Sequence, residues 1–410
     1  MQPELPSFGQ ALATVFSHAG VLSERRPRVE RIPLEECTGR VLAGPVHADR
    51  DMPSFARSTR DGFACRAAEA SAHGWLAVTG SIRAGDPPAP PLTPGAAFEI
   101  MTGAAVPEGA DAVAMLEHVE HAEVKIRLAA GRNLDAGENV VAAGAEARAG
   151  HELISPGVRL GPAHIAAAAC CGYATMEVFA KPRVAILTTG DELLPVASNP
   201  APGQIRNSNA PMLASLVARQ GTEAWVLPAV RDEGAAVEAA LRRAMDADLL
   251  LISGGVSAGK FDLVEPALAR IGASFFFTGV RIQPGKPLVF GEIARAGGAL
   301  PLFGLPGNPI SSAATFLLFA APILAALAGS HEPSPRFDLA RLARDVKGKP
   351  GLTRFVPATT TFAFGLPEVA PVGSQGSGDL AAFARADCFV EVPEGTERLF
   401  AGETAHILRF

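Results

Sequence analysis

Three short apolar runs, each followed by a loop that contains glycine, constrain the fold of this chain more than any other feature. The loops are residues 188–192, which follow the run 184–187, residues 253–257, which follow the run 249–252, and residues 304–311. Runs of this length are typical of strands buried on both faces of a sheet. In an open α/β sheet, the loops at the carboxyl ends of the strands form the ligand crevice. One such loop alone fits a simple tight turn, but three in one segment predict a site for an anionic ligand.

The length of 410 residues predicts several domains, because single hydrophobic cores stop growing at a smaller size. Helical periodicity covers 8–23, 158–180, 211–220 and 234–245, and short β-type runs with Pro and Gly fill the segment from about 51 to 146. We therefore expect a multidomain α/β plus β protein. Its parts are a helical and extended N-terminal scaffold at 1–50 with 147–180, an inserted β domain at 51–146, a central doubly wound α/β domain at 181–330, and a small C-terminal β domain at 331–410.

The charge balance argues against general binding of polyanions. A formal net charge of -6 and a pI near 5.9 provide no field that attracts nucleic acid or an anionic membrane surface. The five cysteines show no Cys-x-x-Cys spacing, which favours reduced, structural thiols over zinc binding or redox exchange. Without an apparent targeting signal, the cytoplasm is the expected location.

The glycine loops suit an oxyanion or a phosphate group. Glycine lets the backbone turn sharply and aim successive N–H groups at an anion, and a following helix adds its positive end. The segment 306–309 lacks the Gly-Lys-Ser/Thr of a Walker loop, and no Gly-x-Gly-x-x-Gly opens a helix, so the usual nucleotide-binding motifs are not present. Ser257 and Ser311 have no His nearby in the sequence, which disfavours covalent acyl chemistry.

Four acidic residues accompany the loops: Asp191, Glu192, Asp232 and Asp262. Each alone fits a helix cap or a solvated loop. Together they would repel a phosphate unless a divalent cation or a basic side chain intervened, so we expect a Mg²⁺ ion to bridge them. Further positive charge is available from Lys260, Arg281 and Lys286, the last held between two prolines.

The order of these motifs resembles the molybdopterin molybdenumtransferase family, which includes the MoeA proteins and the E domain of gephyrin. The residues that carry the resemblance are 189–193, 203–209, 253–257, 284–287 and 305–311, with 55–64, 100–104, 107–113 and 374–380 outside the central segment. The resemblance covers nearly the whole chain. Departures occur at 56–60 and 140–146, and Gln283 stands where the family often has a lysine.

The resemblance implies a central domain of the molybdopterin-binding type, an N-terminal scaffold that dimerises, and a homodimer with its active cleft between two subunits. The implied reaction delivers molybdate to adenylylated molybdopterin and releases AMP with the help of Mg²⁺. In that reaction, Asp61 and Thr102 would reach the cleft of the partner subunit. The implied catalytic residues are Asp61, Asp191, Glu192, Asp232, Asp262 and Lys286, of which Asp191, Asp232 and Asp262 would also bind the metal.

The resemblance also implies a set of substrate-binding positions. Lys286, Ser311, Arg354 and Ser377 match those for the oxyanion. The others are Thr102, Gly190, Asn209, Gly254, Gly255, Ser257, Pro284, Gly285, Pro287, Pro306, Gly307, Asn308 and Pro309. An upstream adenylyltransferase and molybdoenzyme acceptors are the protein partners that such a reaction would require.

Three alternatives stay open at this stage. The chain could be a dimeric scaffold or specialised paralogue without this activity, as the likeness to gephyrin permits. It could insert tungsten in place of molybdenum. It could also be a pterin adenylyltransferase, although the β domains on both sides of the central segment disfavour that class.

Overall fold

A computed structural model describes residues 4–25, 27–255, 264–295, 298–331, 335–362 and 364–410. Ser257, Lys260 and Asp262 therefore lie outside the described residues. The chain divides into two compact units, of which the first contains 1–43, 156–161 and 176–410, and the second contains 44–155 and 162–175. Each unit has its own hydrophobic cores.

A six-stranded sheet forms the centre of the first unit, with strand order β16-β13-β17-β21-β20-β18. Its strands are β13 (Arg183–Thr188), β16 (Glu223–Val226), β17 (Leu249–Ser253), β18 (Ala273–Phe277), β20 (Val289–Arg295) and β21 (Gly298–Leu305). The neighbours β16, β13, β17 and β21 are parallel, whereas β20 runs antiparallel to both β21 and β18. The three predicted apolar runs therefore lie in adjacent parallel strands, and their loops leave the same edge of the sheet.

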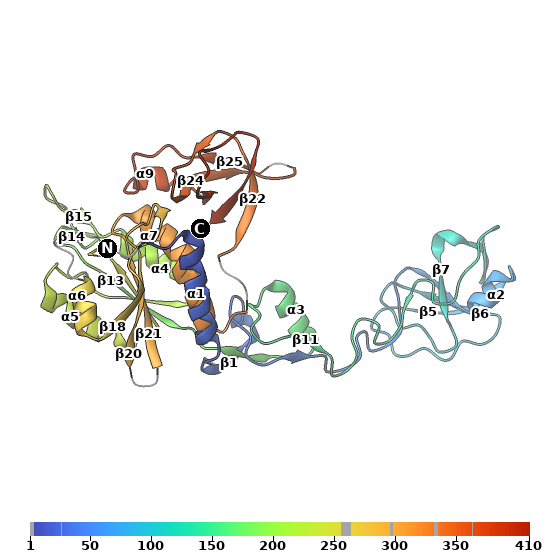
Figure 1. The fold of residues 1–410 in the computed structure, drawn as a ribbon. Coiled ribbons are helices and arrows are strands. Elements are labelled where there is room, and N and C mark those ends of the chain that lie inside the picture. The colour runs from blue at the N-terminus through green and yellow to red at the C-terminus, as the bar shows by residue number, and fades with distance from the viewer. Residues whose placement is uncertain (1–3, 26, 256–263, 296–297, 332–334, 363) are drawn as a thin grey trace. The chain divides into compact units, whose positions relative to one another are not determined.

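Helices cover both faces of this sheet (Figure 1). On one face lie α1 (Phe8–Ser23), α4 (Asn209–Arg219), α7 (Pro309–Thr315) and α8 (Ala321–Leu327), and on the other lie α5 (Gly234–Arg243) and α6 (Val264–Arg270). The capping box between Ser7 and Gln10 fixes the start of α1. The expected helices at 8–23, 211–220 and 234–245 are confirmed, as is the doubly wound class.

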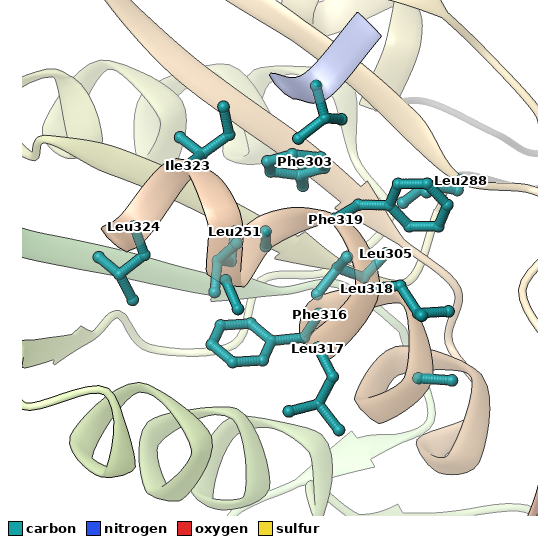
Figure 2. Packing of buried hydrophobic residues seen from close by; sticks show 14 of the residues in the cluster. Leu251, Leu288, Phe303, Leu305, Phe316, Leu317, Leu318, Phe319, Ile323 and Leu324 are labelled. Atoms are coloured by element: carbon teal, nitrogen blue, oxygen red, sulfur yellow. The ribbon is translucent and has the colours of Figure 1, made fainter. Parts of the chain in front are cut away.

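The most apolar segment is the run Pro309–Leu327, in which a π-helical turn η4 (Phe316–Ala320) joins α7 to α8. Its length and mean hydropathy of 2.0 would allow it to cross a membrane, but 89% of the segment is buried within the protein. Figure 2 shows Phe316, Phe319 and Ile323 among the side chains that pack with Phe303 of β21. The segment therefore has the environment of a core helix.

The C-terminal part of the first unit contains a second six-stranded sheet of order β19-β24-β25-β22-β28-β26, in which β24 also pairs with β26. Its strands are β19 (Ile282–Gln283), β22 (Phe337–Leu342), β24 (Thr353–Thr361), β25 (Glu368–Pro371), β26 (Cys388–Val392) and β28 (Thr404–Arg409). The additional pairing curls the sheet into a small barrel-like domain. Strand β19 joins this domain although it precedes its partner strand β24 by about 70 residues in the sequence, because Ile282 and Gln283 pair with Thr353 and Arg354.

The second unit contains a six-stranded sheet of order β7-β4-β6-β5-β9-β8. Its strands are β4 (Gly62–Cys65), β5 (Leu76–Ile82), β6 (Ala96–Ile100), β7 (Ala112–Met115), β8 (Val119–Ala122) and β9 (Lys125–Leu128), with α2 (Ala67–Ser71) beside them. Three of these strands, β5, β6 and β7, lie at the β-type runs that the sequence predicts between 51 and 146.

Short elements complete both units. They are β1 (Val29–Pro33), β2 (Val46–His47), β3 (Arg57–Ser58), β10 (Val140–Val141), β11 (Glu152–Ile154), α3 (Pro162–Cys170), β12 (Thr175–Phe179), β14 (Leu193–Leu194), β15 (Ile205–Arg206), β23 (Val346–Lys347), α9 (Leu380–Phe383) and β27 (Arg398–Leu399), with the 3₁₀ turns η1 (Leu34–Glu36), η2 (Leu116–His118) and η3 (Ala244–Asp246). The predicted helix at 158–180 is wrong beyond Cys170. Residues 175–179 form β12, which pairs with β1, so long-range strand pairing overrides the local alanine-rich pattern.

Candidate active site

A cavity of about 860 Å³ opens where β13, β17 and β21 end. All three predicted glycine loops line it, together with the segment that leads into α4. The cavity is lined by Thr188, Thr189, Gly190, Glu192, Leu193, Pro200, Gln204, Ile205, Arg206, Asn207, Ser208, Asn209, Asp232, Ser253, Gly254, Gly255, Pro287, Pro306, Gly307, Asn308, Pro309, Gly378 and Leu380. We call it the strand-exit cavity.

Side-chain hydrogen bonds tie the loops of the strand-exit cavity together. The Asn209 amide donates to Ser253 Oγ at 2.9 Å and to the Gly307 carbonyl at 2.6 Å. The hydroxyl of Ser312 donates to the Pro306 carbonyl at 2.5 Å and lies 3.1 Å from Ser253 Oγ. One polar cluster therefore links the start of α4 to the ends of β17 and β21.

Two glycines allow the loops to come this close. Gly254 has φ +97°, and a Cβ atom there would lie 2.4 Å from the Thr189 carbonyl oxygen. Gly255 has φ +62°, and its Cβ would lie 2.8 Å from Thr189 Oγ1. Both positions therefore exclude a side chain by backbone conformation and by space.

One polar atom of this cavity, Asn209 Oδ1, is buried without a hydrogen-bond partner among the described residues. Buried polar groups are hydrogen-bonded in most native structures. A polar ligand in the cavity would supply the missing partner, so this observation supports ligand binding independently of the cavity's shape.

Acidic residues gather at the β13 end of the strand-exit cavity. Glu192 and Asp232 line it, and the Asp232 backbone N–H donates to Asp191 Oδ1 at 3.3 Å. Partial burial raises the pKa of Asp232, and the negative charges of Asp191 and Glu192 raise it further. Carboxylates this crowded favour a cation between them. The described residues contain no group of three or more His, Cys, Asp or Glu arranged to hold a metal ion.

A second cavity of about 370 Å³ shares Pro287, Pro306 and Asn308 with the first. It is lined by Ile282, Gln283, Pro284, Gly285, Lys286, Pro287, Pro306, Asn308, Ile310, Ser311, Lys349, Leu352, Arg354, Val356, Pro357, Ser374, Gly376 and Ser377. We call it the cationic cavity, because Lys286, Lys349 and Arg354 contribute a charge of +3 and no carboxylate belongs to its described lining.

The barrel-like domain supplies half of the cationic cavity. The pairing of Gln283 with Arg354 brings Arg354 next to the 283–287 segment, and Arg354 Nε is buried without a hydrogen-bond partner in the described part of the chain. The Asn308 amide donates to Ser377 Oγ at 2.8 Å across 69 residues of sequence. Lys286, Ser311, Arg354 and Ser377, which the sequence predicts as an oxyanion set, therefore line one cavity.

Asp61 and Thr102 lie in the second unit and form a pair of their own. Asp61 Oδ1 accepts the Thr102 backbone N–H at 2.7 Å and the Thr102 hydroxyl at 2.8 Å. These two hydrogen bonds, the backbone one first, lower the pKa of Asp61, so the exposed carboxylate stays ionised.

The structure thus brings most of the predicted site residues to the two cavities of the first unit. Asp191 lies next to the strand-exit cavity, Asp61 and Thr102 lie in the second unit, and Ser257 and Asp262 lie outside the described residues. The sequence interpretation placed Thr188, Thr189 and Ser253 in the predicted loops and Asn207 in the 203–209 motif but gave them no individual role. It did not include Lys349. Asn207 belongs to the same motif as Asn209, and its amide donates to Thr188 Oγ1 at 2.8 Å, so the alternation of two asparagines was the available signal.

Fold and site together define a multidomain α/β protein with a polar ligand site at three adjacent strand exits. Three family profiles match the chain: the MoeA N-terminal region (domains I and II) at residues 6–172, a probable molybdopterin-binding domain at 185–326, and the MoeA C-terminal region (domain IV) at 339–410. The chain belongs to the molybdopterin molybdenumtransferase (MoeA) family.

Individual relatives agree with this membership over most of the chain. A molybdopterin molybdenumtransferase from Bacillus subtilis is 36% identical over 393 residues, covering 94% of this chain and 90% of the relative. One from Staphylococcus aureus strain Mu50 is 34% identical and covers 92% and 90%. A crystal structure of the molybdopterin biosynthesis MoeA protein from Pyrococcus horikosii is 31% identical, covers 99% of each chain, and has a TM-score of 0.74. The expected family and fold are therefore confirmed.

Proposed function

We propose that this chain is a molybdopterin molybdenumtransferase, which inserts molybdenum into molybdopterin during biosynthesis of the molybdenum cofactor. In the finer form of the proposal, the substrates are adenylylated molybdopterin and molybdate, and AMP leaves with the assistance of Mg²⁺. The pterin nucleotide occupies the strand-exit cavity, and the oxyanion occupies the cationic cavity.

The observation that carries the proposal is the separation of charge between two adjoining cavities. Among the described lining residues, the strand-exit cavity has two acids, Glu192 and Asp232, and one base, Arg206, which gives a net charge of -1, whereas the described lining of the cationic cavity carries +3. A dianion such as molybdate prefers the second cavity, where guanidinium, ammonium and hydroxyl groups are available. Because the cavities share Asn308 and two prolines, an oxyanion bound in one lies next to a ligand bound in the other.

The acidic residues fit a magnesium ion. Mg²⁺ prefers oxygen ligands and is usually held by one or two carboxylates together with water and substrate phosphates. Asp191 and Asp232 would hold it, with Glu192 beside them. The pKa of Asp232 is raised mainly by partial burial and further by the charges of Asp191 and Glu192, and a bound cation would offset those charges. When bound, the ion would neutralise charge at the phosphate bond that breaks. Asp262 stays a predicted ligand.

The remaining side chains would bind and orient the substrates. Asn209 and Thr189 offer buried oxygen atoms to polar hydrogens of the pterin nucleotide. Lys286 and Arg354 would hold the oxyanion, with Ser311 and Ser377 donating hydrogen bonds. In the homodimer that we propose, Asp61 and Thr102 of one subunit act at the cavities of the other.

A reconstituted reaction tests the proposal. Purified chain is incubated with adenylylated molybdopterin, molybdate and Mg²⁺, and both AMP and active cofactor are measured. The expected result is release of AMP in step with cofactor formation. Binding of both substrates without turnover would instead support a scaffold, turnover with tungstate alone would support a tungsten-inserting enzyme, and adenylylation of free molybdopterin would support an adenylyltransferase.

The wider context of the proposal is testable in the same preparation. We expect a homodimer in solution, and a cytoplasmic location where an upstream adenylyltransferase supplies the substrate and molybdoenzymes accept the product. Light scattering gives the mass of the assembly, and a monomer at micromolar concentration would contradict a cleft shared between subunits.

A further inference from the structure

We infer that Lys349 is a specificity-determining residue of the cationic cavity, where it provides the third positive charge that selects a dianion. This inference rests on the proposed function, because it concerns the oxyanion of that reaction. Its basis is the position of one lysine on a turn that the barrel-like domain extends into the cavity.

A tight turn presents Lys349 to the cavity. Residues Lys349–Leu352 form a turn closed by the Leu352 N–H, which donates to the Lys349 carbonyl at 3.2 Å. Pro350 and Gly351, the latter with φ +75°, occupy the two central positions, the arrangement that a type II turn favours. Lys349 and Leu352, the two ends of this turn, both line the cationic cavity. The turn therefore has a defined conformation and aims both residues at the same space.

The base of the turn is fixed to the barrel-like domain. Strand β23 pairs with β27, and the Gly348 N–H donates to the Glu397 carbonyl at 2.8 Å. A Cβ atom at Gly348 would lie 1.7 Å from the Thr396 carbonyl oxygen, so the two backbones touch. Lys349 thus directly follows a residue whose backbone is held against Thr396 and Glu397.

The charge of Lys349 is not neutralised locally. Within the described residues, its ammonium has neither an ion pair nor a hydrogen bond, and the described lining of the cavity contains no Asp or Glu. The chain as a whole carries a net charge of -6, so the positive charge of this cavity is a local feature. Such a cluster favours a dianion over a monoanion, because the attraction grows with the charge of the ligand.

A second position of the cavity lining could carry the third charge, namely Gln283, which stands where the family often has a lysine. Gln283 is neutral and pairs directly with Arg354 in the sheet. A lysine at position 283 would therefore put its charge beside Arg354 in the same cavity. Lys349 brings the same charge to the cavity from the turn, away from this pairing.

Equilibrium binding of molybdate to the full-length protein tests the inference. We expect Lys349→Gln to raise the Kd for molybdate about tenfold, the lower end of what a charge-assisted contact contributes, because the side chain is exposed and screened. The salt dependence of the affinity should also become weaker. Arg344→Gln is the matched control: it removes an exposed positive charge from the same segment, outside the cavity lining, and should leave the Kd within about twofold.

A rescue variant separates charge from structure. In the double variant Lys349→Gln with Gln283→Lys, the charge returns from the other wall, and the Kd should recover to within about threefold of the wild-type value. A structural role for Lys349 predicts no recovery. Weaker binding without rescue, or a Kd for Lys349→Gln equal to that of Arg344→Gln, would overturn the inference while leaving the proposed function intact. If the wild-type protein bound no molybdate, both the inference and the proposed function would be contradicted.

Discussion

The hydrogen bonds of Asn209 are the contacts whose loss should be most informative. Asn209→Ala removes the bonds to Ser253 and to the Gly307 carbonyl and leaves both partners with fewer hydrogen bonds. A typical intramolecular hydrogen bond contributes about 1 kcal/mol to stability, so the variant should lose about 2 kcal/mol of unfolding free energy. For a domain of this size, that corresponds to a fall of about 5 °C in Tm.

The distribution of tryptophans allows this loss to be measured in the relevant unit. The chain has two tryptophans, Trp75 in the second unit and Trp225 on β16 of the central sheet. In a Trp75→Phe background, fluorescence reports Trp225, whose ring lies 3.8 Å from the Arg183 guanidinium. Denaturation followed by this signal therefore reports the sheet that carries the site.

A matched variant on the same helix sets the scale. Ser215 is an exposed residue of α4, and Ser215→Ala should change the unfolding free energy by no more than about 0.5 kcal/mol. If Asn209→Ala behaves like Ser215→Ala, the cross-links between the strand exits contribute nothing to stability and our account of the site is wrong.

Three further predictions concern the strand-exit cavity and the second unit. Gly254→Ala forces a Cβ atom to within 2.4 Å of the Thr189 carbonyl oxygen, so we expect a loss of about 1 to 3 kcal/mol in denaturation and weaker binding of the pterin nucleotide; unchanged stability would mean that the loop shifts freely. Asp232 has a pKa raised above the ordinary 3.8, so the folded chain binds this proton more tightly than the unfolded chain does. The free energy of unfolding should therefore fall as the pH rises from the unfolded pKa through the folded pKa of this group. In Asp232→Asn this pH dependence of the unfolding free energy should disappear, and the variant should be more stable than the wild type at pH 7. Mg²⁺ should no longer raise its Tm. A wild-type pH profile in this variant would refute the assignment of the pH dependence to Asp232. Thr102→Val removes one of the two hydrogen bonds that lower the pKa of Asp61, so NMR titration of that carboxyl should give a higher pKa. On acidification, the variant should therefore lose the stability contributed by the ionised Asp61 at a higher pH than the wild type does.

Much of the site was predictable because its main signals are local. Apolar runs and the glycines that follow them report burial and turns over a few residues, and β13, β17 and β21 appear where the runs predict strands. The family resemblance added the oxyanion set, including Arg354 and Ser377, from outside the central segment. Residues 175–179 were predicted wrongly, because their pairing with β1 depends on a strand far away in the sequence.

The residues for which the sequence predicted no individual role act through long-range contacts. Ser253 gains its place in the site from Asn209 and Ser312, which lie 44 and 59 residues away. Lys349 carries no local signal, since an exposed lysine beside a Pro-Gly turn is an ordinary surface feature. Only the tertiary fold brings these side chains to a cavity.

The sequence alone determined the order of strands and loops, the family, and most of the side chains available for chemistry, because these depend on local periodicity and on motif identity. The tertiary structure decided which of those side chains share a cavity. The pairing of β19 with β24 brings the 283–287 segment to the barrel-like domain, and it thereby separates a cavity of positive charge from the acidic end of the strand-exit cavity. That separation follows from packing between segments about 70 residues apart, which no local pattern encodes.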